Sequence, residues 1–315
     1  MQWVDRIGRR LKLRDLHILL AVVQHGSMAK AATELAISQP AVSKAISDME
    51  HVVGVRLLDR GRNGIVPTAY GRALASRGRA MFDELKQGID ELAWLADPTV
   101  GELRIASTES LAAGFLPEVI ERFAREQPRV RLDVAQAVMN ALHYHDLRER
   151  NVDLLLGRIP LPLEEDDLDV EIVYDDQIVV VASRRSKWAR ARRLKLADLA
   201  AERWILPPAN TMAGLLAAEW FRAGNIEMPR AAVTTLSIHL CRRLAASGQF
   251  VATLPVSVLR STDRDQLKIL PVALPVQSRP VGIVTLKNRT LSPVAKRFIE
   301  CVHRAAKQYA RRPVR

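Results

Sequence analysis

The sequence predicts an α/β protein with an all-α domain at its N-terminus. Apolar side chains recur at helical spacings up to about residue 97. From residue 101 onward, strand-like and helix-like runs alternate, which is typical of βαβ units and a parallel sheet. The chain has 315 residues, enough for two or three domains, and 48% of them are hydrophobic, which argues against general disorder.

The N-terminal domain, residues 1–67, is expected to begin with two short helices. Leucines and a valine form one apolar stripe between residues 13 and 23. Gly26 follows this stripe and ends the helix. Ser27 is placed to cap a second, alanine-rich helix over residues 28–35.

A third helix is expected after a break of about four residues, because Pro40 suits the first turn of a helix. It runs to about residue 53 and stops at Gly54. Apolar pairs at 57–58 and 65–66 then flank a tight hairpin. Two helices joined by a short break, with a packing helix before them, form a helix-turn-helix, and the hairpin adds a wing.

A long linker helix is expected over residues 68–97, with Thr68 as its cap and Asp97-Pro98 as its end. Its apolar positions follow spacings of three and four, which is a heptad pattern and predicts pairing with a second copy. The leucines and methionine assigned to dimerisation are Leu74, Met81, Leu85 and Leu92. Gly78, Gly88 and Leu95 lie on the same seam, where glycine permits close backbone approach.

The remainder, residues 98–315, reads as the α/β domain. Strands are expected at 103–106, 130–138, 152–156, 170–174, 177–182, 250–254, 267–271 and 281–286. Helices are expected at 111–126, 140–150, 212–223, 235–246 and 292–310.

The net charge of +12 is uneven along the chain. Residues 1–72 carry +5 and residues 296–315 carry +6, whereas the 223 residues between them are nearly neutral. Basic ends favour an anionic partner such as nucleic acid. No apolar run is long enough for a membrane helix, and the N-terminus does not resemble a secretory signal, so we expect no membrane partner and a cytoplasmic location.

The third helix has a polar face suited to the major groove of double-stranded DNA. Glutamine and lysine can read base edges or contact phosphate, and serine reads either edge weakly. A small helical domain with a merely solvated polar face is the alternative. The residues assigned to DNA binding are Ser27, Ser38, Gln39, Pro40, Ser43, Lys44, Ser47 and, in the wing, Arg60 and Arg62.

These residues resemble a known family. The runs Gly26-Ser27-Met28-Ala29-Lys30-Ala31-Ala32 and Ser38-Gln39-Pro40-Ala41-Val42-Ser43-Lys44, together with Glu50, Gly54, Arg60 and Pro67-Thr68, resemble the winged helix-turn-helix of LysR-type transcriptional regulators. The start of the chain is most similar to members that control sugar-uptake or aromatic-acid genes. An extension before Leu11 departs from the family pattern.

The resemblance implies a two-lobed effector domain similar to the type 2 periplasmic binding proteins. The lobes would comprise about 98–168 with 278–315, and about 169–277. It implies DNA contacts at Ser38, Gln39, Pro40, Ser43, Lys44 and Arg60, and dimers or tetramers. RNA polymerase is a further candidate partner.

Ligands of open parallel sheets bind beyond the carboxyl ends of the strands. Hydroxyls and an amide in such places favour an anionic or polyhydroxy metabolite, although each of them could simply cap a helix. The residues assigned to the effector are Ser107, Thr108, Ser110, Asn140, Arg158, Pro208, Thr211 and Phe250.

The sequence therefore predicts a ligand-responsive regulator that binds a pseudo-palindromic operator. The alternative is a solute-binding protein or enzyme that uses its helical N-terminus only for assembly. Enzyme activity is not expected, because no nucleophile elbow, phosphate loop or dinucleotide fingerprint occurs. No cofactor or metal is expected. Cys241 and Cys301 are interpreted as packing residues, with a redox pair as the alternative.

Overall fold

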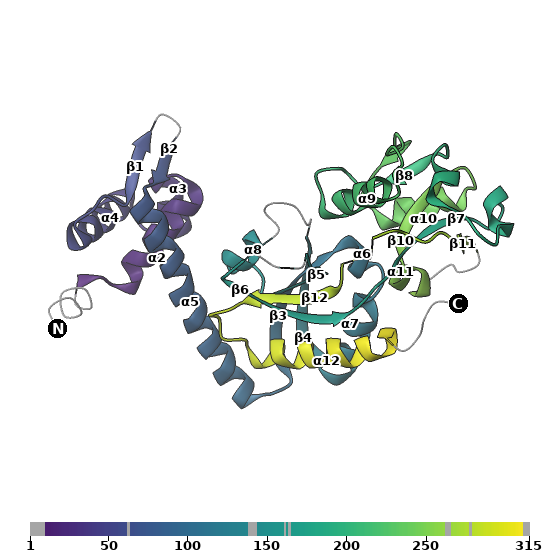
Figure 1. Cartoon of the computed structure of the whole chain (residues 1–315). Coiled ribbons are helices and arrows are strands. Elements are labelled where there is room, and N and C mark those ends of the chain that lie inside the picture. The colour runs from purple at the N-terminus through teal and green to yellow at the C-terminus, as the bar shows by residue number, and fades with distance from the viewer. Residues whose placement is uncertain are drawn as a thin grey trace. The chain divides into compact units, whose positions relative to one another are not determined.

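The structure is a computed structural model, and it describes residues 10–61, 64–137, 144–160, 162, 165–261, 266–276 and 279–310 (Figure 1). The chain divides into two compact units, residues 1–89 and 90–315. Expectations for the N-terminal extension, Arg62, Asn140 and residues 311–315 lie outside the described residues. Within the described part, no helix combines the length and apolar character needed to span a membrane.

The first unit contains the three expected helices, α2 (Leu13–His25), α3 (Met28–Glu34) and α4 (Gln39–Val53). Gly26 and Gly54 end α2 and α4 with positive φ angles of 61° and 77°, a conformation that glycine adopts without strain. The helices enclose one apolar core, whose fully buried members include Leu19, Val22 and Val42. The expected boundaries are therefore confirmed to within about a residue or two, the usual precision of a helix end.

The expected hairpin is confirmed as β1 (Leu58–Gly61) paired antiparallel with β2 (Gly64–Pro67). One hydrogen bond ties the start of the hairpin to α4, and another ties β2 to the end of α2. The Glu50 carboxylate of α4 accepts the backbone N–H of Leu57 at 2.7 Å, and the N–H of Ile65 donates to the carbonyl of Gly26 at 2.8 Å. The wing is thus held against the helix-turn-helix by hydrogen bonds.

The helix α5 (Ala69–Ala96) follows the wing. Thr68 caps it as expected, because its Oγ1 accepts the N–H of Gly71 at 3.0 Å. Gly78 faces inward, since a Cβ atom there would lie 2.9 Å from Cδ1 of Leu16. This glycine therefore serves close packing of α5 on α2 within the first unit.

The second unit contains two five-stranded sheets, one in each lobe (Figure 1). The first sheet has a parallel part, β4–β3–β5, continued by β12, which is antiparallel to both of its neighbours. Its strands, in order across the sheet, are β4 (Arg129–Ala137), β3 (Val100–Thr108), β5 (Leu154–Arg158), β12 (Val281–Leu286) and β6 (Leu168–Tyr174).

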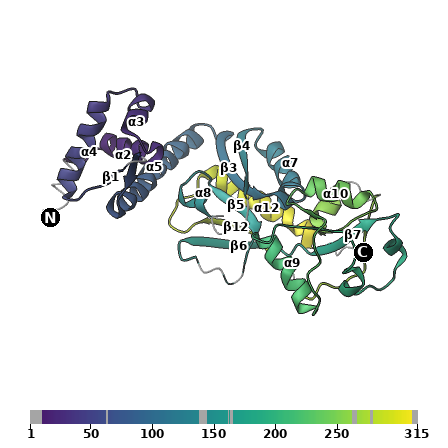
Figure 2. The same ribbon diagram turned by 90° about the horizontal axis from the view of Figure 1, so that it is seen from above.

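Helices cover both faces of this first sheet (Figure 2). One face packs against α7 (Leu116–Glu126) and α12 (Pro293–Ala310), and Phe123 and Phe298 meet there edge to face at 5.2 Å between ring centroids. The other face carries α8 (His145–Arg148). The single helix expected over 111–126 is interrupted: α6 (Glu109–Ala112) ends before Gly114, and α7 starts beside Pro117.

The second sheet belongs to the second lobe. Across the sheet its strands are β11 (Leu267–Ile269), β7 (Ile178–Ser183), β10 (Val251–Pro255), β8 (Trp204–Leu206) and β9 (Val233–Thr234). Strand β7 is antiparallel to β10 and β11, and β10, β8 and β9 are parallel. One face packs against α9 (Met212–Ala223), the other against α10 (Ile238–Ala246) and α11 (Val256–Ser261).

One expectation about the lobes is wrong. Residues 169–174 were expected to begin the second lobe, but β6 pairs with β12 in the sheet of the first lobe. The chain therefore crosses between lobes after Tyr174 and returns before Val281. The sequences of β6 and β7 show similar strand patterns, so they do not reveal to which lobe each strand belongs. Only the strand with which each one pairs decides this.

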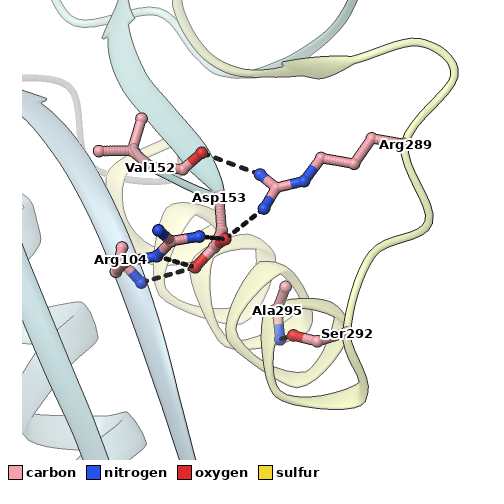
Figure 3. Close-up of polar contacts among 6 residues, drawn as sticks. All are labelled: Arg104, Val152, Asp153, Arg289, Ser292 and Ala295. Carbon is pink, nitrogen blue, oxygen red and sulfur yellow. Dashed lines mark hydrogen bonds and ion pairs between the residues drawn. The ribbon is translucent and has the colours of Figure 1, made fainter. Parts of the chain in front are cut away.

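A buried ion cluster joins three segments of the first lobe (Figure 3). The Asp153 carboxylate, just before β5, accepts from the guanidinium of Arg104 on β3 at 2.8 Å and from Arg289 after β12 at 2.7 Å. Arg289 also donates to the carbonyl of Val152 at 2.8 Å, and its side chain is 1% exposed. In the same loop, Ser292 accepts the N–H of Ala295 at 3.2 Å and caps α12.

Candidate DNA-binding face and effector cleft

The helix α4 presents a polar face to solvent. Its buried side is Val42, Ile46 and Met49, which belong to the core of the first unit. The expected recognition residues lie on the other side: Gln39, Pro40, Lys44 and Ser47 are exposed, and Ser43 is half-buried. Because the apolar face of α4 is packed in the core, its polar face must point to solvent.

Two of the serines assigned to DNA binding have a structural partner. Ser27 Oγ accepts the N–H of Lys30 at 3.4 Å, and Ser38 Oγ accepts the N–H of Ala41 at 3.3 Å. Both are N-caps, a role that stabilises a helix by about 0.5–2 kcal/mol. The Ser38 cap also fixes where α4 begins and so where Gln39 lies.

The wing places Arg60 on β1, opposite Ile65 of β2. This residue is therefore near the tip of the hairpin. The other assigned wing arginine, Arg62, follows β1 directly in the sequence.

An apolar stripe runs along the exposed side of α5. Met81 and Leu85 are each 52% exposed and Leu92 is 68% exposed. Leu95, which lies on the expected seam, extends the stripe, and so does Ile89, which was not expected there. Leu74 differs, because it packs against the core of the first unit.

A cleft lies between the two lobes of the second unit. From the first lobe it is lined by the ends of β3 and β4 and by α6, and from the second by α9, α10 and nearby loops. Its lining residues are Thr108, Glu109, Ser110, Gln136, Ala137, Arg158, Ile178, Pro207, Thr211, Met212, Ala213, Leu216, Trp220, Thr235, Leu236, Ile238, Cys241, Thr253, Pro255 and Arg279.

Two hydroxyls from the first lobe face one another in this cleft. Thr108 Oγ1 and Ser110 Oγ are 3.4 Å apart. Thr108 occupies the N-cap position of α6, but its side chain makes no cap hydrogen bond. Unlike the serines of the N-terminal helices, these hydroxyls are not used to cap a backbone, and both can turn toward a ligand. Glu109, between them in sequence, accepts from the Gln136 amide at 3.4 Å.

Arg158 forms a buried tie where the chain crosses between lobes. Its guanidinium pairs with the Asp176 carboxylate at 2.7 Å and donates to the carbonyls of Asp176 and Arg279 at 2.7 and 3.2 Å. Asp176 is held in turn by the hydroxyl of Ser257 at 2.7 Å. With these contacts, Arg158 holds both crossing segments together as well as lining the cleft.

The second cation of the cleft is Arg279, which sequence reasoning missed. It lies on the returning crossing segment, and its contacts are long: 3.6 Å to Met212 Sδ and 3.8 Å to the Glu219 carboxylate. The side chain is 24% exposed. A basic residue directly after the predicted lobe boundary at residue 278 is the signal that could have found it.

Three assigned effector residues are not among the residues that line the cleft. Phe250 directly precedes β10, whereas Pro255, at the other end of this strand, lines the cleft. Phe250 therefore lies at the end of the second sheet that is remote from the cleft, and the guanidinium of Arg203 stacks over its ring at 4.5 Å. Ser107 is buried within β3, with its hydroxyl 3.4 Å from the carbonyl of Thr108. Pro208 is adjacent to the lining, and its carbonyl accepts from Thr211 Oγ1 at 2.7 Å.

The two cysteines lie in different cores and are both free thiols. Cys301 is fully buried on α12, whereas Cys241 on α10 reaches the cleft. Burial raises the pKa of the Cys241 thiol to about 11, so it stays protonated at neutral pH. The alternative of a redox pair between them is therefore excluded by their separation into two lobes.

Two families match this chain. Residues 13–72 match the family described as "Bacterial regulatory helix-turn-helix protein, lysR family", and residues 96–307 match the "LysR substrate binding domain". The regulator GbpR of Azospirillum brasilense is 27% identical over 305 residues, covering 96% of this chain and 89% of GbpR.

Solved structures of full-length regulators share the fold. OxyR from Pseudomonas aeruginosa is similar with a TM-score of 0.69 at 21% identity, covering 94% of this chain and 95% of that one. CbnR, a LysR family transcriptional regulator solved in complex with its target DNA, is similar with a TM-score of 0.54 at 24% identity, covering 94% and 100%. With both domains matched in order, the chain belongs to the LysR family of DNA-binding transcriptional regulators, with a winged helix-turn-helix domain and an effector-binding domain.

Proposed function

We propose that this regulator binds a pseudo-palindromic operator as an oligomer, through the exposed face of α4 and the wing. The observation that carries the proposal is the polar face of Gln39, Ser43, Lys44 and Ser47, which is held outward by a buried apolar face on the same helix. Glutamine and lysine supply donors and acceptors for base edges, and the wing arginines supply charge for phosphate.

The oligomer would be built through the α5 stripe, with the linker helix taken as residues 68–97. A monomer rarely leaves five large apolar side chains exposed along one helix. Their heptad spacing suits a second copy of the same helix. Two paired helices would place two recognition helices on half-sites about one helical turn apart, or a multiple of that.

Mutation of the α4 face tests the DNA-binding part of the proposal. A duplex site is first selected from a random library with the full-length protein. We expect Gln39→Ala with Lys44→Ala to weaken binding to that site by ~2–6 kcal/mol, because two base contacts are worth about 1–3 kcal/mol each. The matched control is Gln24→Ala with Lys12→Ala, an exposed glutamine and lysine off the face. Equal affinity of the two variants would show that α4 is misassigned.

The inter-lobe cleft is the proposed effector site, and its lining favours an anion with an apolar body. The walls from the second lobe are mostly apolar, with Leu216, Trp220 and Leu236 among them. A polyhydroxy compound would leave hydroxyls unpaired against these walls, which costs free energy. Arg279 supplies a cation whose ion pair is long enough to exchange for a ligand carboxylate.

Binding of the effector is expected to change the angle between the lobes. The ligand would contact hydroxyls of the first lobe and apolar side chains of the second, so it would favour whichever lobe angle satisfies both. A thermal-shift series tests the effector class, since a ligand that binds only the folded state raises the melting temperature. Apolar carboxylates should stabilise the protein, and their uncharged amides should not. Stabilisation by sugars alone would refute the assignment.

A further inference from the structure

A second strongly basic surface lies in the effector domain, far from the winged domain in sequence. Residues 183–203, here named the basic segment, carry eight Lys or Arg against two acidic residues, a net charge of +6, which equals half the charge of the whole chain. The segment follows β7 at the end of the second lobe remote from the first (Figures 1 and 2). All eight of its cations are exposed: Arg184, Arg185, Lys187, Arg190, Arg192, Arg193, Lys195 and Arg203.

The backbone of the basic segment is held by the fold, although its charges face solvent. The N–H of Arg184 donates to the carbonyl of Gln266 at 3.0 Å. Ser186 caps the 3-10 helix η1 (Lys187–Arg190), with its Oγ accepting the N–H of Trp188 at 3.3 Å. Trp188 and Leu194 pack against the core of the second lobe. The cations are therefore displayed on a defined surface.

The positive charge of the segment is compensated only in part. Its two acidic residues are Asp198, which accepts the backbone N–H of Lys195 at 2.8 Å, and Glu202, which pairs with Lys187 at 2.7 Å. Across the residues that the structure describes, none of the ion pairs involves Arg190, Arg192 or Arg193. These three arginines lie in the middle of the segment.

The sheet topology brings the last cation of the basic segment, Arg203, to the same end of the sheet as its first residues. Strand β10 runs parallel to β8 and antiparallel to β7. The start of β8 and the end of β7 therefore lie at the same end of the strands in this sheet. Arg203 precedes β8 there, and donates to the Gln249 side chain at 3.1 Å. The effector cleft lies at the other end of these strands, where Ile178 and Pro255 line it. The basic segment therefore stays accessible to a partner when the cleft is occupied.

The composition of the surface favours phosphate over a protein partner. Six of its eight cations are arginines, whose planar fork matches phosphate oxygens. Interfaces between proteins are built around buried apolar or aromatic anchors. None of the large apolar side chains found exposed in the described residues lies within 183–203.

We propose that the basic segment is a second DNA contact, which binds the phosphate backbone of double-stranded DNA without reading its sequence. This contact would add to that of the winged domain and increase the total affinity for DNA, while α4 would still determine which operator is bound. The contact would be strongly salt-dependent, because each neutralised phosphate releases condensed counterions.

The test measures binding of the full-length protein to a 60-base-pair mixed-sequence duplex over a series of salt concentrations. The test variant is Arg190→Gln, Arg192→Gln and Arg193→Gln together. The control variant removes three exposed cations from the first lobe instead, by Arg125→Gln, Arg131→Gln and Lys307→Gln. We expect the slope of log K against log salt to become shallower by about 2–3 for the test variant, at ~0.9 per phosphate, and by less than 1 for the control.

A second background separates this proposal from the function of α4. Both triple variants are also made with Gln39→Ala and Lys44→Ala, and residual binding to the mixed duplex is measured. The basic segment should account for most of that residual binding, so the combined test variant should bind the mixed duplex least. The proposal is overturned if the test and control variants have equal slopes in both backgrounds, whatever the result for α4. It is equally overturned if the test variant keeps its DNA binding and loses binding to RNA polymerase, since the surface would then serve a protein partner.

Discussion

Replacing Asp153 with asparagine should destabilise the effector domain strongly, although Asp153 lies outside the cleft lining. The carboxylate balances Arg104 and Arg289, and the side chain of Arg289 is only 1% exposed (Figure 3). Removal of one partner from such a buried pair costs about 3–5 kcal/mol, because the remaining charge is left without compensation. With a urea m-value of about 3 kcal/mol/M for a unit of this size, the unfolding midpoint should fall by ~1–1.7 M.

The assay is urea unfolding of the full-length protein at pH 7, followed by circular dichroism, with Asp133→Asn as control. Asp133 is an exposed carboxylate on the edge strand β4 of the same sheet, so its loss should shift the midpoint little. A double variant, Asp153→Asn with Arg289→Met, should recover part of the loss because the uncompensated charge is removed as well. Equal midpoints for Asp153→Asn and Asp133→Asn would refute the reasoning.

The pH dependence supplies an independent check. Burial alone would raise the pKa of Asp153, but the hydrogen bonds from Arg104 and the charges of Arg104 and Arg289 outweigh it, and the pKa is lowered. The carboxylate therefore stabilises the fold above the unfolded pKa of about 4. That contribution is lost as the pH falls through the lower pKa of the folded state. The gap between wild type and Asp153→Asn should be constant from pH 8 to 5 and should shrink in stronger acid.

Three other predictions address the remaining parts of the molecule. Gly71→Ala should destabilise the first unit by at least ~1–3 kcal/mol, since the new Cβ would lie 1.9 Å from the Leu57 carbonyl, whereas Gly88→Ala on the same helix, with nothing within 4 Å, should not; thermal melting compares them. Leu85→Lys with Leu92→Lys should raise the dimer Kd at least ~1000-fold, because burial of each leucine contributes about 1.5–3 kcal/mol, and sedimentation should detect monomers that the control Leu215→Lys with Leu240→Lys does not produce. Arg279→Gln should abolish stabilisation by apolar carboxylates while DNA affinity without ligand is unchanged, and a variant that still responds fully would remove Arg279 from the site.

Local signals were sufficient for the first unit. Its helix ends follow from residues that act on their immediate neighbours: Gly26 and Gly54 supply positive φ, and Ser27 and Ser38 supply caps. The wing could be predicted for the same reason, since its turn lies within ten residues. The parallel direction of β3, β4 and β5 could also be predicted, because each crossover is carried by a neighbouring stretch of chain.

Features that depend on distant pairing could not be predicted. Strand β6 was assigned to the wrong lobe because its partner, β12, is more than 100 residues away and no local pattern names it. Arg279 was missed for a related reason, since its place in the cleft arises from the return of the chain to the first lobe. Phe250 was wrongly assigned to the effector site because a sequence shows where a strand starts but not which end of the strand faces the cleft.

The charge of the chain shows why averages over long windows mislead. Residues 73–295 appear neutral in sum, yet the basic segment within them carries +6 and the rest carries −5. At the C-terminus the opposite holds: part of the basic excess is already used, because Arg304 pairs with Glu126 and Arg297 with Glu300 on the described part of α12. The basic excess within residues 73–295 is thus concentrated in one segment, whose two ends lie at the end of the second sheet opposite the cleft. An effector domain that only sensed a metabolite would have no need of such a surface, whereas one that also holds DNA would, and the salt dependence of binding decides between the two.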